Sequence, residues 1–292
     1  VAHILPAMSE PDRVVRAMTM DGAFRLIAAV VTDTARSALG AQSTGDDLGL
    51  RLSELLAAAV LVRETTQPAR RVQIVWRDAR GSSLVADSLP DGLCRGLVNP
   101  GDPSAVLVGG DHRLHVNYTL PNGALHQGTV AVPDGDDMAT ALMRYFKESE
   151  QIVAMVAIAA LPGPGGVRAV GGYVVQLLPE ATREVIDAVT DHLGQLEPMS
   201  ILLEGRGRTA AELAKVVFEG FPSAELASSP VGFGCTCSEM RVMTSILTLP
   251  ETEVESMLEG DPLEVRCDAC GRQYVIAPEA LREFRDRSRA RA

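Results

Sequence analysis

Two apolar stretches near the start of the chain flank a tight-turn signal. Residues 13–20 and 23–31 are rich in β-forming side chains, and Asp21-Gly22 lies between them. Asp-Gly between two apolar runs predicts a β-hairpin. A helix is then expected to begin at Thr32 or Asp33, because either side chain can cap its first turn.

Apolar residues follow a helical period over residues 46–64. The positions that share one face are Leu48, Leu52, Leu55, Leu56 and Ala59. Apolar residues three and four apart indicate an amphipathic helix. The stretch Ala-Ala-Ala-Val-Leu-Val inside this helix predicts burial on more than one side.

From residue 71 to residue 132 the period changes to that of strands. Apolar and polar residues alternate around Trp76, around Val116 and again after His126. The turn signals between these runs are Arg80-Gly81, Gly109-Gly110 and Pro121-Asn122-Gly123. The pattern predicts an antiparallel meander. The histidines His112, His115 and His126 fall on it, but no carboxylate or serine motif frames them, so we interpret them as surface or hydrogen-bonded strand residues.

A helix over residues 136–150 and two apolar strands over residues 152–161 and 168–178 complete this part. The glycine- and proline-rich loop 162–166 lacks the Lys-Ser/Thr ending of a phosphate-binding loop, so a hairpin turn is the better interpretation. We therefore expect an α+β fold, in which residues 1–179 form a mostly antiparallel sheet with helices.

Residues 180–234 carry helical patterns that are separated by short, flexible connections. Residues 180–196 predict an amphipathic helix, and Thr209-Ala-Ala-Glu212 is a capping box that opens a second short helix ending at Gly220. Glycine and serine occupy these connections. The segment is predicted to be a two-helix connector, and the alternative is an ordinary helical layer packed on the preceding sheet.

The last segment, residues 235–292, has short elements. Ser238 is expected to cap a helix that runs to Leu247, and Thr248-Leu-Pro-Glu251 is a capping box for the next helix. Residues 264–267 and 272–276 predict a hairpin, and a helix is expected from Pro278. A domain this small needs a metal ion to fold.

Four cysteines of this segment form two local pairs. Cys235 and Cys237 are one pair, Cys267 and Cys270 are the other, and 29 residues separate the pairs. Four soft thiolates in two pairs are the ligand set of a tetrahedral zinc site. We predict one Zn²⁺ on these cysteines. The spacing leaves open whether the ion is purely structural, as in a zinc ribbon.

Length and charge narrow the range of functions. A chain of 292 residues exceeds what one core usually serves, which predicts two or three domains. The net charge is −11, and the segments 1–179, 180–234 and 235–292 are each net negative. This charge argues against nucleic acid and anionic membrane as partners. No apolar run is long enough to span a bilayer and no secretory signal pattern is visible, so a cytoplasmic location is expected.

The fifth cysteine, Cys94, lies between Leu93 and Leu97, far from the two pairs in the sequence. Cysteine in an apolar setting behaves as a small hydrophobic residue. We therefore expect Cys94 to be a core residue without a role in the metal site. In a reducing compartment the paired cysteines indicate metal or redox chemistry rather than structural disulfides.

This order of parts resembles the heat-shock protein 33 family of redox-regulated chaperones. The cysteine motifs Cys-Thr-Cys-Ser and Cys-Asp-Ala-Cys-Gly follow a helical connector and an N-terminal α/β domain, as in that family. Further similar motifs are Tyr145-Phe146-Lys-Glu-Ser149-Glu150-Gln151, Gly171-Gly172-x-x-x-Gln176-x-x-Pro179 and Leu249-Pro250-x-x-Glu253-Val254. The connector is the part where the match is weakest.

The resemblance implies a function and a mechanism. Residues 1–179 would be the substrate-binding domain, residues 180–234 the helical linker, and residues 235–292 the zinc-binding redox switch. The reduced, zinc-bound protein would be inactive. Oxidation would form the disulfides Cys235–Cys237 and Cys267–Cys270, release zinc, unfold the linker and expose a surface for unfolded client proteins. The activity would be ATP-independent holding during oxidative stress, with a homodimer as the activated form.

Two other classes of protein use similar cysteine spacings. A zinc ribbon can bind nucleic acid, and the arginine-rich C-terminal helix could serve that purpose, but the negative charge of every segment argues against it. A zinc enzyme keeps an open coordination position, whereas four cysteines without a neighbouring general base predict a closed site. We therefore expect a chaperone and not an enzyme.

Overall fold

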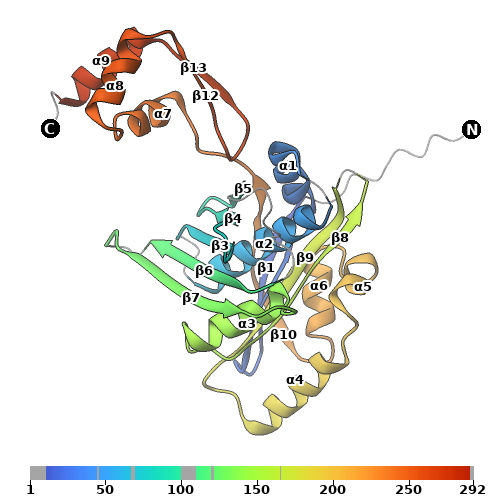
Figure 1. Ribbon diagram of the computed structural model, residues 1–292. Coiled ribbons are helices and arrows are strands. Elements are labelled where there is room, and N and C mark those ends of the chain that lie inside the picture. The colour runs from blue at the N-terminus through green and yellow to red at the C-terminus, as the bar shows by residue number, and fades with distance from the viewer. Residues whose placement is uncertain are drawn as a thin grey trace, which may run out of the picture. The chain divides into compact units, whose positions relative to one another are not determined.

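The computed structural model describes residues 11–44, 46–66, 70–99, 110–119, 122–164 and 166–289. The chain divides into two compact units, Val1–Phe233 and Gly234–Ala292 (Figure 1). The fold is α+β, as expected. The finer division of the first unit into a domain of residues 1–179 and a linker of residues 180–234 stays a prediction.

A five-stranded antiparallel sheet forms one layer of the N-terminal unit. Its strand order is β10-β1-β2-β9-β8. The strands are β1 (Arg13–Thr19), β2 (Phe24–Val30), β8 (Ala154–Gly163), β9 (Gly166–Leu177) and β10 (Ser223–Pro230). β1 and β2 are the predicted hairpin, and Gly163 pairs with Gly166 at the turn between β8 and β9, which confirms the hairpin interpretation of that loop.

A six-stranded sheet forms a second layer, in the order β11-β5-β4-β3-β6-β7. Its strands are β3 (Val72–Asp78), β4 (Ser83–Ser88), β5 (Leu93–Asn99), β6 (His112–Thr119), β7 (Leu125–Val132) and β11 (Gly232–Phe233). The strands β3 to β7 are antiparallel as predicted, but the single meander is wrong. β3 lies between β4 and β6, so β3-β4-β5 form a short meander and the β6-β7 hairpin adds to the other side of β3, whereas β11 adds to β5 in parallel. Of the predicted turns, Gly109 and Pro121 fall outside the described residues, whereas Gly110 and Gly123 have positive φ angles of +83° and +81°, as turn glycines often do.

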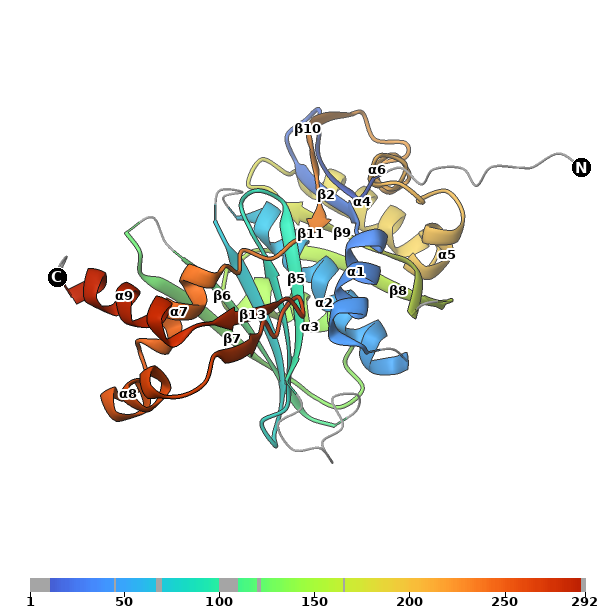
Figure 2. The same ribbon diagram turned by 90° about the horizontal axis from the view of Figure 1, so that it is seen from above.

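Three helices lie between the two sheets (Figure 2): α1 (Thr32–Gln42), α2 (Asp46–Thr65) and α3 (Met138–Glu148). In α2 every side chain from Leu55 to Val62 is fully buried. The helix packs against β9 and β8 on one side and against β4 and β3 on the other. Burial on more than one side is therefore confirmed, and α2 forms the centre of the larger core.

The opposite face of the five-stranded sheet is covered by α4 (Arg183–Gln195), α5 (Met199–Glu204) and α6 (Ala210–Val217). Alternate residues of β2 serve the two faces: Ile27 and Ala29 belong to the core around α2, and Leu26 and Ala28 to the core under α4–α6. This period of two is what a strand buried on both faces requires.

The expected two-helix connector is wrong in its number of elements. The segment contains α5 as a third helix, and it continues into β10, which pairs with β1 except at Leu226, where the register shifts by one residue. The six residues of α5 begin after Pro198 without a side-chain cap, which removes the usual signal for a helix start. The predicted capping box of Thr209 and Glu212 is confirmed at the start of α6.

The start of α1 is also capped differently from the expectation. Its N-cap is Val31, which has no side chain able to accept a hydrogen bond. The carboxylate of Asp12 accepts one from the backbone N–H of Thr34 at 2.6 Å, and the hydroxyl of Thr32 accepts one from the backbone N–H of Val170 at 3.0 Å. A residue distant in sequence therefore supplies the acceptor that local pattern assigned to Thr32 or Asp33.

The C-terminal unit contains α7 (Glu239–Ile246), α8 (Glu251–Glu259), the hairpin β12 (Leu263–Arg266) and β13 (Gln273–Ile276), and α9 (Pro278–Arg289). Ser238 caps α7 as predicted. The capping box at Thr248 is wrong, because α8 begins after Pro250 and the Thr248 hydroxyl donates to the carbonyl of Ser245. In either unit, no described helix is long and apolar enough to cross a membrane.

Candidate metal centre

The two cysteine pairs of the C-terminal unit lie on different local structures. Cys235 and Cys237 belong to the extended segment just before α7, where Ser238 begins the helix. Cys267 and Cys270 lie in the turn between β12 and β13. In this turn the backbone N–H of Cys267 donates to Arg272 O at 2.9 Å and that of Gly271 to Cys267 O at 2.8 Å. Gly271 has φ of +71°, a conformation that favours glycine.

The fold of this unit brings the two pairs together. The Sγ atoms of Cys235 and Cys267 are 3.8 Å apart, and those of Cys237 and Cys270 are 3.4 Å apart. All four sulfur atoms lie within 4.8 Å of one another, and all four cysteines are free thiols. Four sulfurs at about 2.3 Å from one tetrahedral ion would be about 3.8 Å apart. The four cysteines can therefore hold a metal ion.

Tyr274 is part of this site and was not predicted from the sequence. It lies on β13, and its hydroxyl donates to Cys237 Sγ at 3.0 Å. This hydrogen bond raises the pKa of the Tyr274 hydroxyl. A donor to a ligand sulfur orients that ligand and offsets its negative charge. Tyr274 lies in the predicted strand 272–276, but its neighbours Gln273 and Val275 give no signal that tells which strand residue reaches the cysteines.

The protonation state of the four cysteine thiols depends on whether a metal ion is bound between them. Removal from water raises the pKa of Cys270 to about 12, with hydrogen bonding from Cys237 adding to the shift, and it raises the pKa of Cys267 as well. Without a cation these thiols stay protonated at neutral pH. A bound metal ion reverses this balance, because a coordinating thiol is deprotonated.

The apolar core around the site is small. Among the described residues of the C-terminal unit, six apolar side chains are buried: Ile246, Val254, Leu258, Ile276, Pro278 and Leu281. They come from α7, α8, β13 and α9, so they hold the helices onto one side of the hairpin. Small cores of this kind usually need a metal ion or disulfides for stability.

Cys94 belongs to the core of the other unit, as its apolar setting suggested. It lies on β5 and is fully buried, with its Sγ 3.5 Å from Ser88 Oγ. Burial raises the pKa of this thiol to about 11, so it is protonated and unreactive. Cys94 packs with the residues around α2, which is a structural position.

The three histidines of β6 and β7 do not assemble into a site. His112 is buried beside Trp76, His115 hydrogen-bonds Thr129 Oγ1 at 2.9 Å, and His126 stacks on Tyr118. Within the described ranges, the four cysteines are the single group of three or more potential ligand side chains close enough to share an ion.

Known proteins resemble this chain along most of its length. The profile of the family described as "Hsp33 protein" matches residues 12–277. A 33 kDa chaperonin of Desulforamulus reducens is 30% identical over 287 residues, which cover 94% of this chain and 97% of the relative. One of Bacillus velezensis is 28% identical over 289 residues, with 94% and 98% covered. The crystal structure of a 33 kDa chaperonin from Thermotoga maritima has the same fold, with a TM-score of 0.82 at 20% identity and coverage of 96% and 99%.

Proposed function

We propose that this chain, which belongs to the Hsp33 family of chaperones, is a redox-regulated, ATP-independent holdase. The reduced, zinc-bound protein is the inactive form, and oxidation converts it into a form that binds unfolded proteins and prevents their aggregation. The observation that carries this proposal is the cluster of four free thiols within 4.8 Å in a unit with very little buried apolar surface.

Cys235, Cys237, Cys267 and Cys270 would hold one Zn²⁺ through their thiolates. The ion would supply the crosslink that ties the segment before α7 to the β12–β13 turn. Structural zinc of this kind contributes on the order of 10 kcal/mol or more to folding. Four sulfur ligands leave no open coordination position, so the site supports a structural and redox role rather than catalysis by the metal.

Oxidation removes all four ligands at once. Cys235 with Cys237, and Cys267 with Cys270, would each form one disulfide. Two electrons per disulfide pass to an oxidant of the peroxide class, which is reduced to water with two protons taken from solvent, because the zinc-bound thiolates carry none. Each disulfide closes a loop of only a few residues, so it constrains the unfolded chain little. The link between the two pairs is lost, and the C-terminal unit unfolds.

Client-binding surface then comes from the segment that precedes the cysteines. The helices α4–α6 cover a face of the five-stranded sheet that includes Leu26, Val175 and Tyr173. When this segment loses its attachment to a folded C-terminal unit, its apolar faces and the sheet face beneath them become available. Unfolded or oxidatively damaged proteins in the cytoplasm are the proposed clients, and the activated form is proposed to be a homodimer.

The test follows zinc, thiols and activity in one sample. The reduced protein should contain one zinc per chain, show five titratable thiols after denaturation and be a poor inhibitor of aggregation of a thermally unfolded client. After peroxide treatment it should lose the zinc and four thiols and suppress aggregation without ATP, and a thiol reductant with zinc should reverse all three changes. Oxidised protein that loses zinc but neither binds a hydrophobic dye nor suppresses aggregation would leave a structural zinc ribbon as the better description.

A nucleic-acid-binding zinc ribbon is the other class to separate. Its affinity would fall steeply with salt, because phosphate contacts release counterions. Filter binding with single- and double-stranded DNA and RNA at low salt should detect no such complex for this protein.

A further inference from the structure

The edge strand β10 is held mainly through its backbone. It lies antiparallel to β1, from Arg13 opposite Pro230 to Thr19 opposite Ser223. Its side chains are exposed or half-buried along its whole length, and Leu226 is 55% exposed. The side-chain links come from β1, where Arg13 donates to Ser228 Oγ at 2.9 Å and Arg16 to Ser229 Oγ at 2.8 Å. Backbone pairing with β1 therefore holds β10 in place, and its own side chains add only the two serine hydroxyls as acceptors.

The strand beneath it, β1, is anchored independently of β10. Val14 belongs to the core around α2, and Val15 and Ala17 belong to the core on the opposite face of the sheet. β1 also pairs with β2 from Arg13 to Met18. If β10 leaves, β1 stays in the sheet and presents a row of unpaired backbone N–H and C=O groups.

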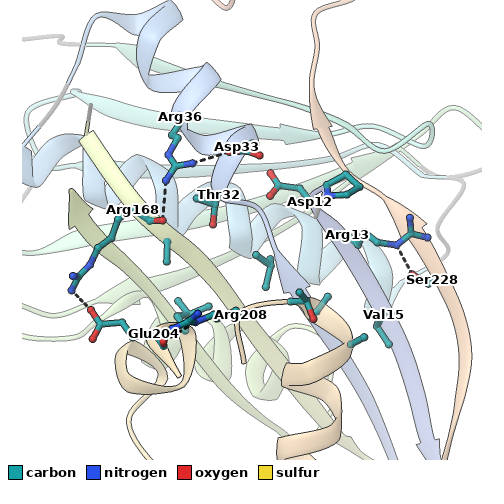
Figure 3. Close-up of a pocket in the computed structure, with 17 residues that line it drawn as sticks. Asp12, Arg13, Val15, Thr32, Asp33, Arg36, Arg168, Glu204, Arg208 and Ser228 are labelled. Carbon is teal, nitrogen blue, oxygen red and sulfur yellow. Dashed lines mark hydrogen bonds and ion pairs between the residues drawn. The ribbon is translucent and has the colours of Figure 1, made fainter. Parts of the chain in front are cut away.

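The segment that leads into β10 borders an open groove. This groove, of about 660 Å³, is lined by Arg13 of β1, Arg168 of β9 and Glu204 of α5, while Val15 and Leu203 at its base belong to the buried core (Figure 3). At its rim, Arg168 of β9 pairs with Glu204 of α5, and both side chains are about half exposed. Exposed ion pairs contribute only about 0–1 kcal/mol. This ion pair therefore adds little to the attachment of α5, which the buried side chains of α5 and α6 provide.

The end of β10 is directly joined to the first cysteine pair. The backbone N–H of Val231 donates to Asp12 O at 3.0 Å and that of Gly232 to Gly92 O at 3.2 Å. β11 consists of only two residues, and only Gly234 separates it from Cys235. Loss of structure from Cys235 onward therefore leaves this short junction as the remaining attachment on the C-terminal side of β10.

We propose that the edge of β1 uncovered by β10 is a client-binding site that takes an extended, unfolded polypeptide segment as a new antiparallel strand. This inference rests on the proposed function and specifies where and in what conformation clients bind. β10 itself shows the fit: seven residues of β1 are paired, and the side chains of the added strand stay largely in solvent. Backbone recognition of this kind tolerates almost any sequence, which a holdase requires.

The first test uses the unaltered protein. The backbone amides of residues 13–19 that bond to β10, about every second one because β1 also pairs with β2, should be protected from hydrogen exchange in the reduced protein, exchange roughly tenfold faster or more after oxidation, and regain protection when an unfolded client is added. Amides of β2, which lies inside the sheet, are the internal control and should stay protected throughout. Exchange at residues 13–19 that a bound client leaves unchanged would overturn the proposal, and so would protection that returns without client as the mass doubles, since a second copy would then occupy the edge.

The second test locks β10 in place. Met18 lies opposite Ala224, and directly opposed antiparallel residues are within disulfide reach. The double variant Met18→Cys with Ala224→Cys should form this crosslink, verified by peptide mass spectrometry, under the same oxidant that activates the protein. It should still release zinc but lose most of its anti-aggregation activity, whereas each single variant keeps it. A locked protein as active as the oxidised wild type would refute the β1 site and leave the proposed function intact; an inactive oxidised wild type would refute the proposed function itself.

Discussion

The N-terminal unit buries long stretches of its elements, whereas each element of the C-terminal unit buries at most two residues. In α2 the side chains from Leu55 to Val62 are all fully buried between two sheets. In α9 the buried positions are Pro278 and Leu281, and most of the other side chains of that helix are in solvent. The first unit can therefore derive its stability from apolar burial. The second unit has only a small apolar core, so its stability depends on the metal ion that would hold the four cysteines together.

The sharpest test of this difference is removal of the metal. A strong chelator under reducing conditions should unfold the C-terminal unit, because it withdraws on the order of 10 kcal/mol from that unit. The N-terminal unit should keep its own cooperative thermal transition. Hydrogen exchange resolved by peptide would show protection lost over residues 235–289 and retained in α2. Retained protection of α8 and α9 after complete zinc removal would contradict the dependence on metal.

Replacing one ligand should give a smaller effect in the same direction. We expect Cys267→Ser to bind zinc weakly and to be partly active as a holdase even when reduced, because the link between the two pairs is weakened. The matched control is Cys94→Ser, which should leave zinc content and oxidant activation intact. Zinc content and client aggregation measured side by side check both variants. If Cys267→Ser folds normally and stays inactive, the ligand assignment or the switch is wrong.

The two units should also respond to pH in opposite directions. Burial raises the pKa of Glu54 in α2 to about 7, against an ordinary value of 4.5. As pH rises from about 4.5 to about 7, the unfolded chain releases this proton while the folded unit retains it, so the N-terminal unit loses on the order of 2 kcal/mol of stability. The C-terminal unit gains, because thiols release protons when they bind a metal.

Denaturant unfolding of the N-terminal unit at pH 5 and pH 7.5 measures this effect. Glu54→Gln should flatten the difference, because the amide does not titrate. An unchanged pH slope in Glu54→Gln would show that another group causes it.

The smallest expected effect concerns the hydroxyl that contacts a ligand sulfur. Tyr274→Phe removes the hydrogen bond to Cys237 and should lower the affinity for zinc several-fold. Competition with a chromogenic chelator measures it. Tyr118→Phe, which alters a hydroxyl of the N-terminal unit, should leave zinc affinity unchanged. Equal affinities for Tyr274→Phe and the wild type would mean that the hydroxyl is a bystander.

Sequence reasoning succeeded where local pattern determines the structure. The Asp21-Gly22 hairpin, the doubly buried α2 and the two cysteine pairs are each specified by neighbouring residues or a regular period. The approach of the two pairs in space follows from the number of soft ligands, even though 29 residues separate them in sequence.

The features that were not predicted have a common physical cause: each depends on a contact with a residue that is distant in the sequence. β10 has the sequence Ser-Ala-Glu-Leu-Ala-Ser-Ser-Pro, which lacks β-branched residues, and it is a strand because β1 offers an edge. Asp12 caps α1 from outside the helix, and Tyr274 reaches Cys237 only once the hairpin is formed. A single sequence carries no local mark of such contacts.

The position of the chain's one tryptophan decides what fluorescence can report. Trp76 is buried in the N-terminal unit, with the Arg51 guanidinium 5.0 Å from its ring centre and His112 beside it. Tyr274 is the one tyrosine of the C-terminal unit. Emission excited at the red edge, where tyrosine is dark, therefore follows the first unit alone. A flat tryptophan signal during oxidation would mean an intact sandwich of sheets and would say nothing about the state of the cysteine unit, which needs tyrosine emission or a fluorophore attached beyond residue 234.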